Sequence, residues 1–145
     1  MKVKDILGSK GSRVVTIGLR ATLHEALCTL IENKVGALPV RDDAGEILGI
    51  ITERDLMREV YRNSPLSMKG VEEVMTRGIV YAAPDDDVER IMNEMTEGRF
   101  RHMPVMKEGK LVGIVSIGDV VKALLHLTKR QVRDLMDYVA SPTPE

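Results

Sequence analysis

The chain has 145 residues, with 21 basic and 22 acidic side chains and a formal net charge of −1 at pH 7. This balance lacks the basic excess that a nucleic-acid backbone requires, and an aromatic content of 3% leaves few rings on which bases could stack. A single cysteine, Cys28, excludes an internal disulfide and favours a reducing compartment. Because no apolar run reaches membrane-spanning length and the first residues lack the apolar block of a signal peptide, we expect a cytoplasmic protein.

The first half of the chain carries the patterns of a mixed α and β unit. An apolar stretch predicts a short strand near 14–17, and Thr22 with Glu25 has the pattern of a capping box at a helix start. We expect this helix to end at Asn33, which is acceptable at a left-handed C-terminal position. Two more strands, joined by a turn at 42–46, and a second helix follow at 37–41, 47–51 and 53–61.

The second half repeats these patterns after a linker at 63–70. Leu38-Pro39-Val40 returns 65 residues later as Met103-Pro104-Val105, and residues 48–55 return as 112–119. Internal repetition of this kind predicts that each half folds in the same way. The second set of expected elements comprises strands near 79–82, 103–106 and 111–115, a helix from the cap residue Asp87 to Gly98, and a closing helix from 117 into the tail.

One copy of about 60 residues is marginal for independent stability, because a small domain buries a small share of its surface. We therefore predict one domain of class α/β (α+β), in which two copies, residues 1–62 and 71–127, pack sheet to sheet. Apolar residues also precede each copy at matching positions: Val3, Ile6 and Leu7 before the first, and Val71, Val74 and Met75 before the second.

The remaining segment, 128–145, is expected to form a C-terminal helix and a frayed tail at 141–145. Its helical part carries an apolar stripe that needs a partner surface, either the domain itself or a second subunit. The stripe consists of Val132, Leu135, Met136 and Val139.

Together these duplicated motifs resemble the cystathionine-β-synthase (CBS) domain family in its tandem arrangement, the Bateman module. The resemblance covers residues 3–125 and implies two β-α-β-β-α repeats related by a pseudo-twofold axis, often assembled as a disc-shaped homodimer. It also implies an adenosine-containing ligand such as AMP, ADP, ATP, S-adenosylmethionine or a dinucleotide. The motifs that carry it are Pro39-Val40 and Pro104-Val105, Gly49 and Gly113, and the endings Thr52-x-x-Asp55 and Ser116-x-x-Asp119.

The segments Thr52-Glu53-Arg54-Asp55 and Ser116-Ile117-Gly118-Asp119 allow two interpretations. A hydroxyl followed three residues later by a carboxylate is a helix cap. The same helix start offers free N–H groups to a phosphate, and the carboxylate can accept hydrogen bonds from two ribose hydroxyls. The resemblance implies the ligand role for both aspartates.

The segments Val35-Gly36-Ala37-Leu38-Pro39 and Phe100-Arg101-His102-Met103-Pro104 are core strand starts on the simpler interpretation. On the other, which the resemblance implies, they form an apolar slot for adenine and part of a phosphate-binding rim. Gly36 and Ala37 leave room in the first copy, whereas Arg101 and His102 make the second copy more cationic.

In modules of this family, a pocket combines the slot of one copy with the hydroxyl and carboxylate of the other. The resemblance therefore implies two non-equivalent candidate sites, with Arg54, Met103 and Gly118 as further candidates beside them. One candidate site comprises Val15, Gly36, Ala37 and Pro39 with Ser116 and Asp119. The other comprises Val80, Arg101, His102 and Pro104 with Thr52 and Asp55.

The Gly-rich, basic segment 8–13 lacks the glycine spacing and the preceding strand of a P-loop. It favours a solvated loop, with a phosphate contact by Lys10 or Arg13 as the alternative. The three histidines and Cys28 lack metal-site spacing, so no metal is expected.

We therefore expect a regulatory module, not an enzyme, that binds AMP, ADP, ATP or a related adenosyl ligand between its copies. It would signal by a conformational change to its own homodimer or to an effector protein, with no obligatory cofactor and no nucleic-acid or membrane partner. Two alternatives stay open: a structural module with vestigial pockets, and a small nucleotide hydrolase acting through Arg101, His102 and the paired aspartates.

Overall fold

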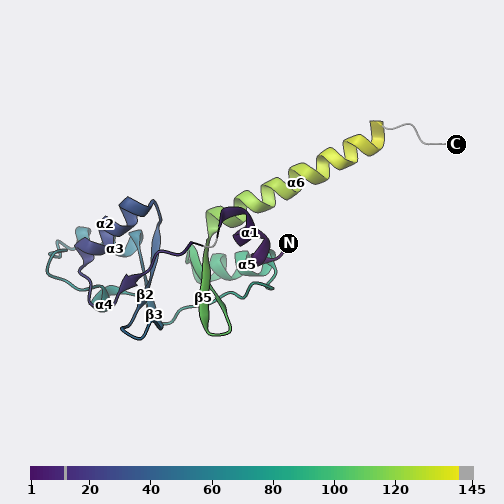
Figure 1. Cartoon of the computed structure of the whole chain (residues 1–145). Helices are drawn as coiled ribbons and strands as arrows, with labels where there is room; N and C mark the ends of the chain where they lie inside the picture. The colour runs from purple at the N-terminus through teal and green to yellow at the C-terminus, as the bar shows by residue number, and fades with distance from the viewer. Residues whose placement is uncertain (12, 141–145) are drawn as a thin grey trace.

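The computed structural model describes residues 1–11 and 13–140, so the tail predicted to fray at 141–145 lies outside the described residues. Helices and strands alternate along the chain in two similar series (Figure 1). The elements are α1 (Val3–Lys10), β1 (Ile17–Gly18), α2 (Leu23–Asn33), β2 (Ala37–Arg41), β3 (Ile47–Thr52), α3 (Glu53–Tyr61), α4 (Val71–Val74), α5 (Val88–Gly98), β4 (His102–Lys107), β5 (Lys110–Ser116) and α6 (Ile117–Ala140).

The strands form two small sheets, one from each half of the chain. In the first sheet β1 is parallel to β2, and β2 is antiparallel to β3; in the second, β4 is antiparallel to β5. The register shifts at the same place in both hairpins, between Val40 and Arg41 and between Val105 and Met106. The two sheets lie in the middle of the molecule with helices on the outer sides, which confirms the predicted fold class (Figure 1).

The short strand of each repeat differs from the prediction. β1 contains two residues, and the segment 79–82 contributes a single bridge from Ala82 to Val105. A proline in the neighbouring strand explains why both strands are short. The Pro104 carbonyl accepts a hydrogen bond from the Ala82 N–H at 2.9 Å, but Pro104 has no N–H to donate to the residues before Ala82. Pro39 stands at the equivalent position beside β1.

The ends of α2 and α5 also differ from the prediction by one residue. The left-handed positions are Lys34, with φ of 54°, and Arg99, with φ of 56°, whereas Asn33 and Gly98 stay helical. The residue after each left-handed position donates its N–H to a carbonyl of the last helical turn: Val35 to Leu30, and Phe100 to Met95, both at 3.1 Å. The predicted equivalence of the two halves therefore extends to their helix ends.

The two entry segments are exchanged between the halves. Val3 and Ile6 of α1 are buried in the core that α5, β4 and β5 build, while Val71 and Met75 are buried in the core of the first half. α1, at the start of the chain, accordingly packs against β5 and α6, and α4 lies near α2 and α3 (Figure 1). Each half thus completes the core of the other.

Gly49 and Gly113 allow these entry segments to approach closely. A Cβ on Gly49 would lie 2.6 Å from Met75 Sδ, and one on Gly113 would lie 2.5 Å from Leu7 Cδ2. Both glycines face the segment that precedes the other repeat. The exchange therefore explains why a residue without a side chain occupies the middle of β3 and β5.

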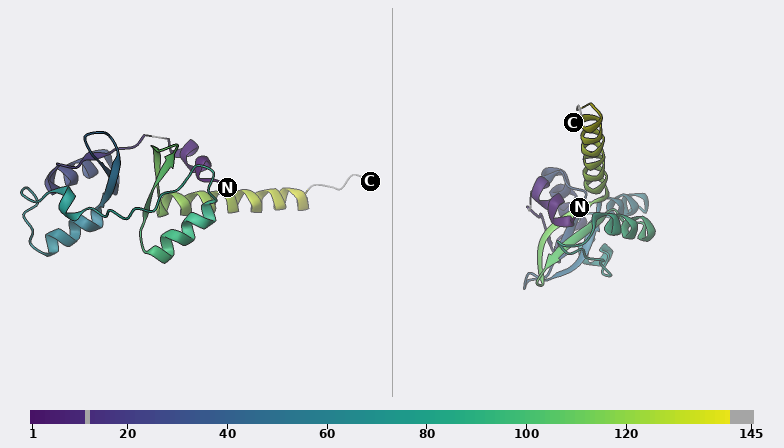
Figure 2. Two further views of the ribbon diagram at one scale, coloured as in Figure 1. Left: turned by 90° about the horizontal axis from the view of Figure 1, so that it is seen from below. Right: turned by 90° about the vertical axis from the view of Figure 1, so that its right-hand side faces the viewer.

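Helix α6 extends well beyond the globular body, as all three views show (Figures 1 and 2). Its first turns pack on the body through Val120, which is fully buried, and through half-buried Leu124. Every side chain from Thr128 to Ala140 is exposed. Over the described part of the chain, no helix combines the length and apolarity needed to cross a bilayer.

Candidate functional site

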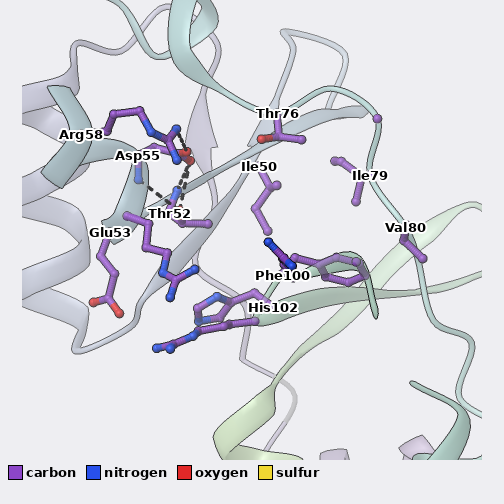
Figure 3. Close-up of a pocket in the computed structure, with 15 residues that line it drawn as sticks. Ile50, Thr52, Glu53, Asp55, Arg58, Thr76, Ile79, Val80, Phe100 and His102 are labelled. Carbon is purple, nitrogen blue, oxygen red and sulfur yellow. Dashed lines mark hydrogen bonds and ion pairs between the residues drawn. The ribbon is translucent and has the colours of Figure 1, made fainter. Parts of the chain in front are cut away.

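A cavity of about 510 Å³ lies where the two halves meet. One wall is the start of α3, the second is the segment that follows α4, and the third is the segment that joins α5 to β4 (Figure 3). Side chains from both repeats therefore face the same space. The lining residues are Ile50, Thr52, Glu53, Arg54, Asp55, Arg58, Thr76, Gly78, Ile79, Val80, Gly98, Arg99, Phe100, Arg101 and His102.

The start of α3 forms a complete capping box. Thr52 Oγ1 accepts a hydrogen bond from the Asp55 N–H at 3.3 Å, and Asp55 Oδ2 accepts one from the Thr52 N–H at 2.8 Å. Asp55 Oδ1 pairs with Arg58 at 3.5 Å. The cap thus occupies one carboxylate oxygen and leaves the other directed toward Arg58 (Figure 3).

An apolar wall lies opposite this polar edge. Ile50, Ile79, Val80 and the ring of Phe100 line it, and Phe100 is the only phenylalanine of the chain. A flat ring among aliphatic side chains suits a flat heterocycle, because apolar surface is removed from water on both partners. This wall can hold a base.

Four arginines give the cavity a positive balance. Arg54, Arg58, Arg99 and Arg101 line it together with two acids, Glu53 and Asp55. These arginines come from the first turns of α3 and from the residues after α5, so the charge depends on both repeats. Guanidinium groups bind phosphate oxygens through paired hydrogen bonds, which makes this edge suited to a phosphorylated ligand.

His102 lies at the boundary between the two candidate sites. A Cβ on Gly36 would be 3.0 Å from His102 Nε2 and 3.3 Å from Glu53 Oε1, so this glycine leaves the space that both side chains use. Burial lowers the pKa of His102, and the attraction of Glu53 and Asp119 for its charged form only partly opposes this effect. His102 is therefore held mainly in its neutral form at pH 7.

The second candidate site is organised differently. Ser116 Oγ accepts a hydrogen bond from the Asp119 N–H at 3.0 Å, which caps α6 as Thr52 caps α3. However, Lys10 Nζ donates to Asp119 Oδ2 at 2.6 Å and to the Ile114 carbonyl at 3.0 Å. Burial acts to raise the pKa of Asp119, but the hydrogen bonds from Lys10 and Ser116 outweigh it and lower that pKa.

Lys10 is placed for this contact by α1. The structure shows residues 8–10 as the last turn of that helix, so the predicted solvated loop begins only at Gly11, where φ is 91°. The other basic residue of the segment, Arg13, donates instead to Asn33 Oδ1 at 3.1 Å. A local loop pattern could not reveal that α1 would dock on the second repeat.

The structure gathers six of the predicted residues in the cavity: Thr52, Arg54, Asp55, Val80, Arg101 and His102. Four others are buried strand residues, namely Ala37, Pro39, Met103 and Pro104, and Met103 belongs to the core of the second half. Val15 is half-buried, and Gly118 is exposed in the first turn of α6.

Sequence reasoning missed several lining residues, above all Arg58 and Arg99, whereas Phe100 lies in a segment that the resemblance had assigned to the apolar slot. Arg58 follows Asp55 by three residues, a spacing that places both on one helix face and could have identified it. Arg99 carries no such signal, because its position depends on the left-handed end of α5. Among the described residues, no group of three or more His, Cys, Asp or Glu side chains could hold a metal ion.

Comparison with known proteins agrees with this architecture. The mitochondrial CBS domain-containing protein CBSX3 of Arabidopsis thaliana is 35% identical over 147 residues, covering 94% of this chain and 71% of the relative. The crystal structure of the CBS-domain containing protein ATU1752 from Agrobacterium tumefaciens is 44% identical, with a TM-score of 0.82 over 85% of this chain and 98% of that one.

A third similar protein has been solved with ligands. The CBS domain pair of protein MJ0100, in complex with 5′-methylthioadenosine and S-adenosyl-L-methionine, is 30% identical with a TM-score of 0.77, covering 86% of this chain and 95% of that one. The model of the CBS domain family matches residues 3–62 and again 71–126. The chain therefore belongs to the CBS domain family and carries two CBS domains in tandem.

Proposed function

We propose that this CBS pair is a regulatory module that binds a phosphorylated adenosyl ligand, such as AMP, ADP or ATP, in the cavity between its repeats. The observation that carries the proposal is the combination of an apolar wall, a carboxylate at a helix N-terminus and four arginines around one space. The wall would hold adenine, Asp55 would accept hydrogen bonds from ribose hydroxyls, and the arginines would bind phosphate.

The similar MJ0100 structure supports an adenosyl ligand, since it contains 5′-methylthioadenosine and S-adenosyl-L-methionine. These two ligands differ from nucleotides in charge, and the charge of the cavity favours nucleotides in our proposal. S-adenosylmethionine carries a positive sulfonium and 5′-methylthioadenosine carries no charge, so neither exploits four arginines as a phosphate does. The ligand of this chain would therefore be a nucleotide.

The proposed output is a change in the packing of the two repeats, passed to the homodimer or to an effector protein. Each repeat supplies part of the core of the other, so a ligand held by both repeats can favour one arrangement of them. The module itself would not be an enzyme. Its single thiol, Cys28, supports a reducing compartment such as the cytoplasm.

Isothermal titration of the full chain with AMP, ADP, ATP, S-adenosylmethionine and 5′-methylthioadenosine tests this proposal. We expect the nucleotides to bind more tightly than the other two, and Asp55→Asn to weaken every adenosyl ligand. Asp43→Asn is the matched control, because Asp43 is exposed in a surface ion pair with Arg20. Absence of binding by all five compounds would contradict the proposal and support a structural module with vestigial pockets.

A further inference from the structure

Helix α6 presents an unbroken row of exposed side chains along one face. The row begins beside the globular body and continues to the far end of the helix, which stands clear of the body in every view (Figures 1 and 2). Its members are Val121, Leu125, Thr128, Val132, Leu135 and Val139, which we call the α6 seam. Its five apolar side chains are each between 50% and 75% exposed.

The seam has the spacing of a coiled coil. Successive members are separated alternately by four and three residues, which is the heptad pattern of core positions a and d. Leu125, Val132 and Val139 fall at a, while Val121, Thr128 and Leu135 fall at d. The residues that pack α6 on its own body, Val120 and Leu124, belong to a different row. The seam therefore makes no contribution to the core of its own chain.

The distal part of the seam lies beyond the CBS match. The family model ends at residue 126, and the ATU1752 structure covers 85% of this chain but 98% of its own length. The distal helix is therefore an extension that the CBS fold does not require. An isolated helical extension is marginally stable in water, because most helical stability in proteins comes from packing of an apolar face.

We propose that the α6 seam pairs with the α6 seam of a second copy of this chain, in a parallel two-stranded coiled coil. A coiled-coil seam needs a helix with the same heptad spacing, and a second copy supplies it with the same register. Valine at position a and leucine at position d favour two strands in parallel, and Val132, Val139 and Leu135 follow this rule. The other a and d positions are less selective.

Avoidance of like-charge repulsion favours one direction of the pairing. One flank of the seam is basic, with Lys122, Lys129 and Arg133, while the opposite flank is uncharged or acidic, with Gln131 and Asp134. Parallel helices place the basic flank of each copy beside the other flank of its partner. Antiparallel helices would place the two basic flanks together, which costs free energy.

The length of the seam implies that the globular bodies also take part. From Val121 to Val139 the helix rises about 27 Å, which falls short of the three to four heptads expected of an independent coiled coil. Parallel pairing brings the bases of both helices together, and there Val121 and Leu125 lie exposed beside each body. The bodies then add contact area that the helices alone lack.

Sedimentation equilibrium of the full chain and two variants tests the pairing. Leu135→Glu places a charge in the seam, whereas Arg130→Gln makes the same change in net charge on the opposite face. Because burial of a leucine side chain contributes roughly 1.5–3 kcal/mol, we expect Leu135→Glu to weaken the dimer by more than about tenfold. Arg130→Gln should leave it unchanged. Both sites are exposed in one chain, so circular dichroism should show both variants folded.

Cysteine cross-linking tests the direction. In a Cys28→Ser background, parallel helices predict that Val139→Cys forms a disulfide with its own copy on mild oxidation. Antiparallel helices would separate the two thiols by about 27 Å. Arg130→Cys, on the opposite face, is the control and should cross-link poorly.

Three results would overturn the proposal: a chain that stays monomeric at all concentrations, a dimer that tolerates Leu135→Glu, or a dimer in which Val139→Cys does not cross-link. A fourth overturning result would be membrane binding by the seam, since a basic amphipathic helix can also bind a membrane surface. Sedimentation of the monomer with phosphatidylserine vesicles, lost in Leu135→Glu, would assign the seam to lipid instead.

Discussion

Lys10 Nζ lies 2.6 Å from Asp119 Oδ2, although 109 residues separate the two side chains along the sequence. The contact joins the last turn of α1 to the first turn of α6. The equivalent carboxylate of the first repeat, Asp55, pairs instead with Arg58 of its own helix, at 3.5 Å. The two repeats therefore share a fold but differ in the charge that faces their helix starts, and the cavity lies at Asp55.

Replacing Lys10 with methionine should raise the pKa of Asp119. The lysine hydrogen bond lowers that pKa against the effect of burial, so its removal lets burial act with less opposition. In the parent chain this carboxylate stabilises the fold above its ordinary pKa of 3.8, and the stabilisation is lost as pH falls through the lowered value. In Lys10→Met the folded-state pKa lies higher, so the carboxylate should contribute less stability and its loss should be complete at a higher pH. Carbon-13 NMR titration of the Asp119 carboxyl measures the shift.

The matched control for that experiment is Lys4→Met. Lys4 lies on the same helix, α1, and pairs with the exposed carboxylate of Asp85 at 3.0 Å, so the variant makes the same change in charge at a different ion pair. It should leave the Asp119 titration unchanged. An Asp119 pKa that is equal in the parent and in Lys10→Met would show that Ser116 alone sets the value.

Gly49→Ala should destabilise the protein more than Gly113→Ala. A Cβ on Gly49 would meet the Thr76 carbonyl oxygen at 2.9 Å, and this backbone is held by reciprocal hydrogen bonds between Thr76 and Ile50. A Cβ on Gly113 would meet the flexible end of Leu7, which can rotate away. We expect a loss of about 1–3 kcal/mol for Gly49→Ala and a smaller loss for Gly113→Ala, measured by urea denaturation.

Gly8→Ala serves as the control for these two substitutions. Gly8 lies inside α1, and a Cβ there would meet nothing within 4 Å. The variant should therefore stabilise the protein by about 0.5–1 kcal/mol, since alanine favours a helix. Equal losses for Gly49→Ala and Gly113→Ala would contradict the distinction between fixed backbone and mobile side chain.

The hairpins and closing helices could be predicted from the sequence because local patterns determine them. The ranges 37–41 and 53–61 agree with β2 and α3, and α6 begins at the expected residue. The exchange of entry helices could not be predicted, because Val3 and Val71 present similar apolar faces that either core would accept. Local periodicity shows that a segment is buried but does not show what it is buried against.

The candidate site shows the same limit. The capping residues Thr52 and Asp55 lie within one short motif, so sequence could identify them. Arg99 and Phe100 enter the cavity because α5 ends one residue later than its glycine suggests. Lys10 approaches Asp119 only after α1 has docked on the second repeat. Such long-range placement has no local signal.

Val71→Ala should loosen the first repeat, although Val71 belongs to the second CBS match. The side chain is fully buried in the core formed by α2, β2 and β3, so its truncation should cost about 2 kcal/mol. Hydrogen exchange followed by mass spectrometry should show faster exchange in β2 and β3 than in β4 and β5. Glu72→Ala, exposed on the same short helix, is the control. Loosening confined to the second repeat would contradict the exchange of entry segments.

Arg101→Gln should weaken the binding of phosphorylated ligands and leave the binding of uncharged ligands unchanged. If the cavity binds nucleotides as proposed, loss of one charged hydrogen bond should weaken ATP binding by about tenfold or more, because such bonds contribute about 1.5–3 kcal/mol. Binding of uncharged 5′-methylthioadenosine should stay unchanged, and added salt should reduce ATP affinity less in the variant than in the parent. Arg20→Gln is the control, since it removes the same charge from an exposed pair with Asp43. Titration calorimetry at two salt concentrations measures all of these affinities. An equal loss for both ligands would show that Arg101 shapes the cavity and does not bind phosphate.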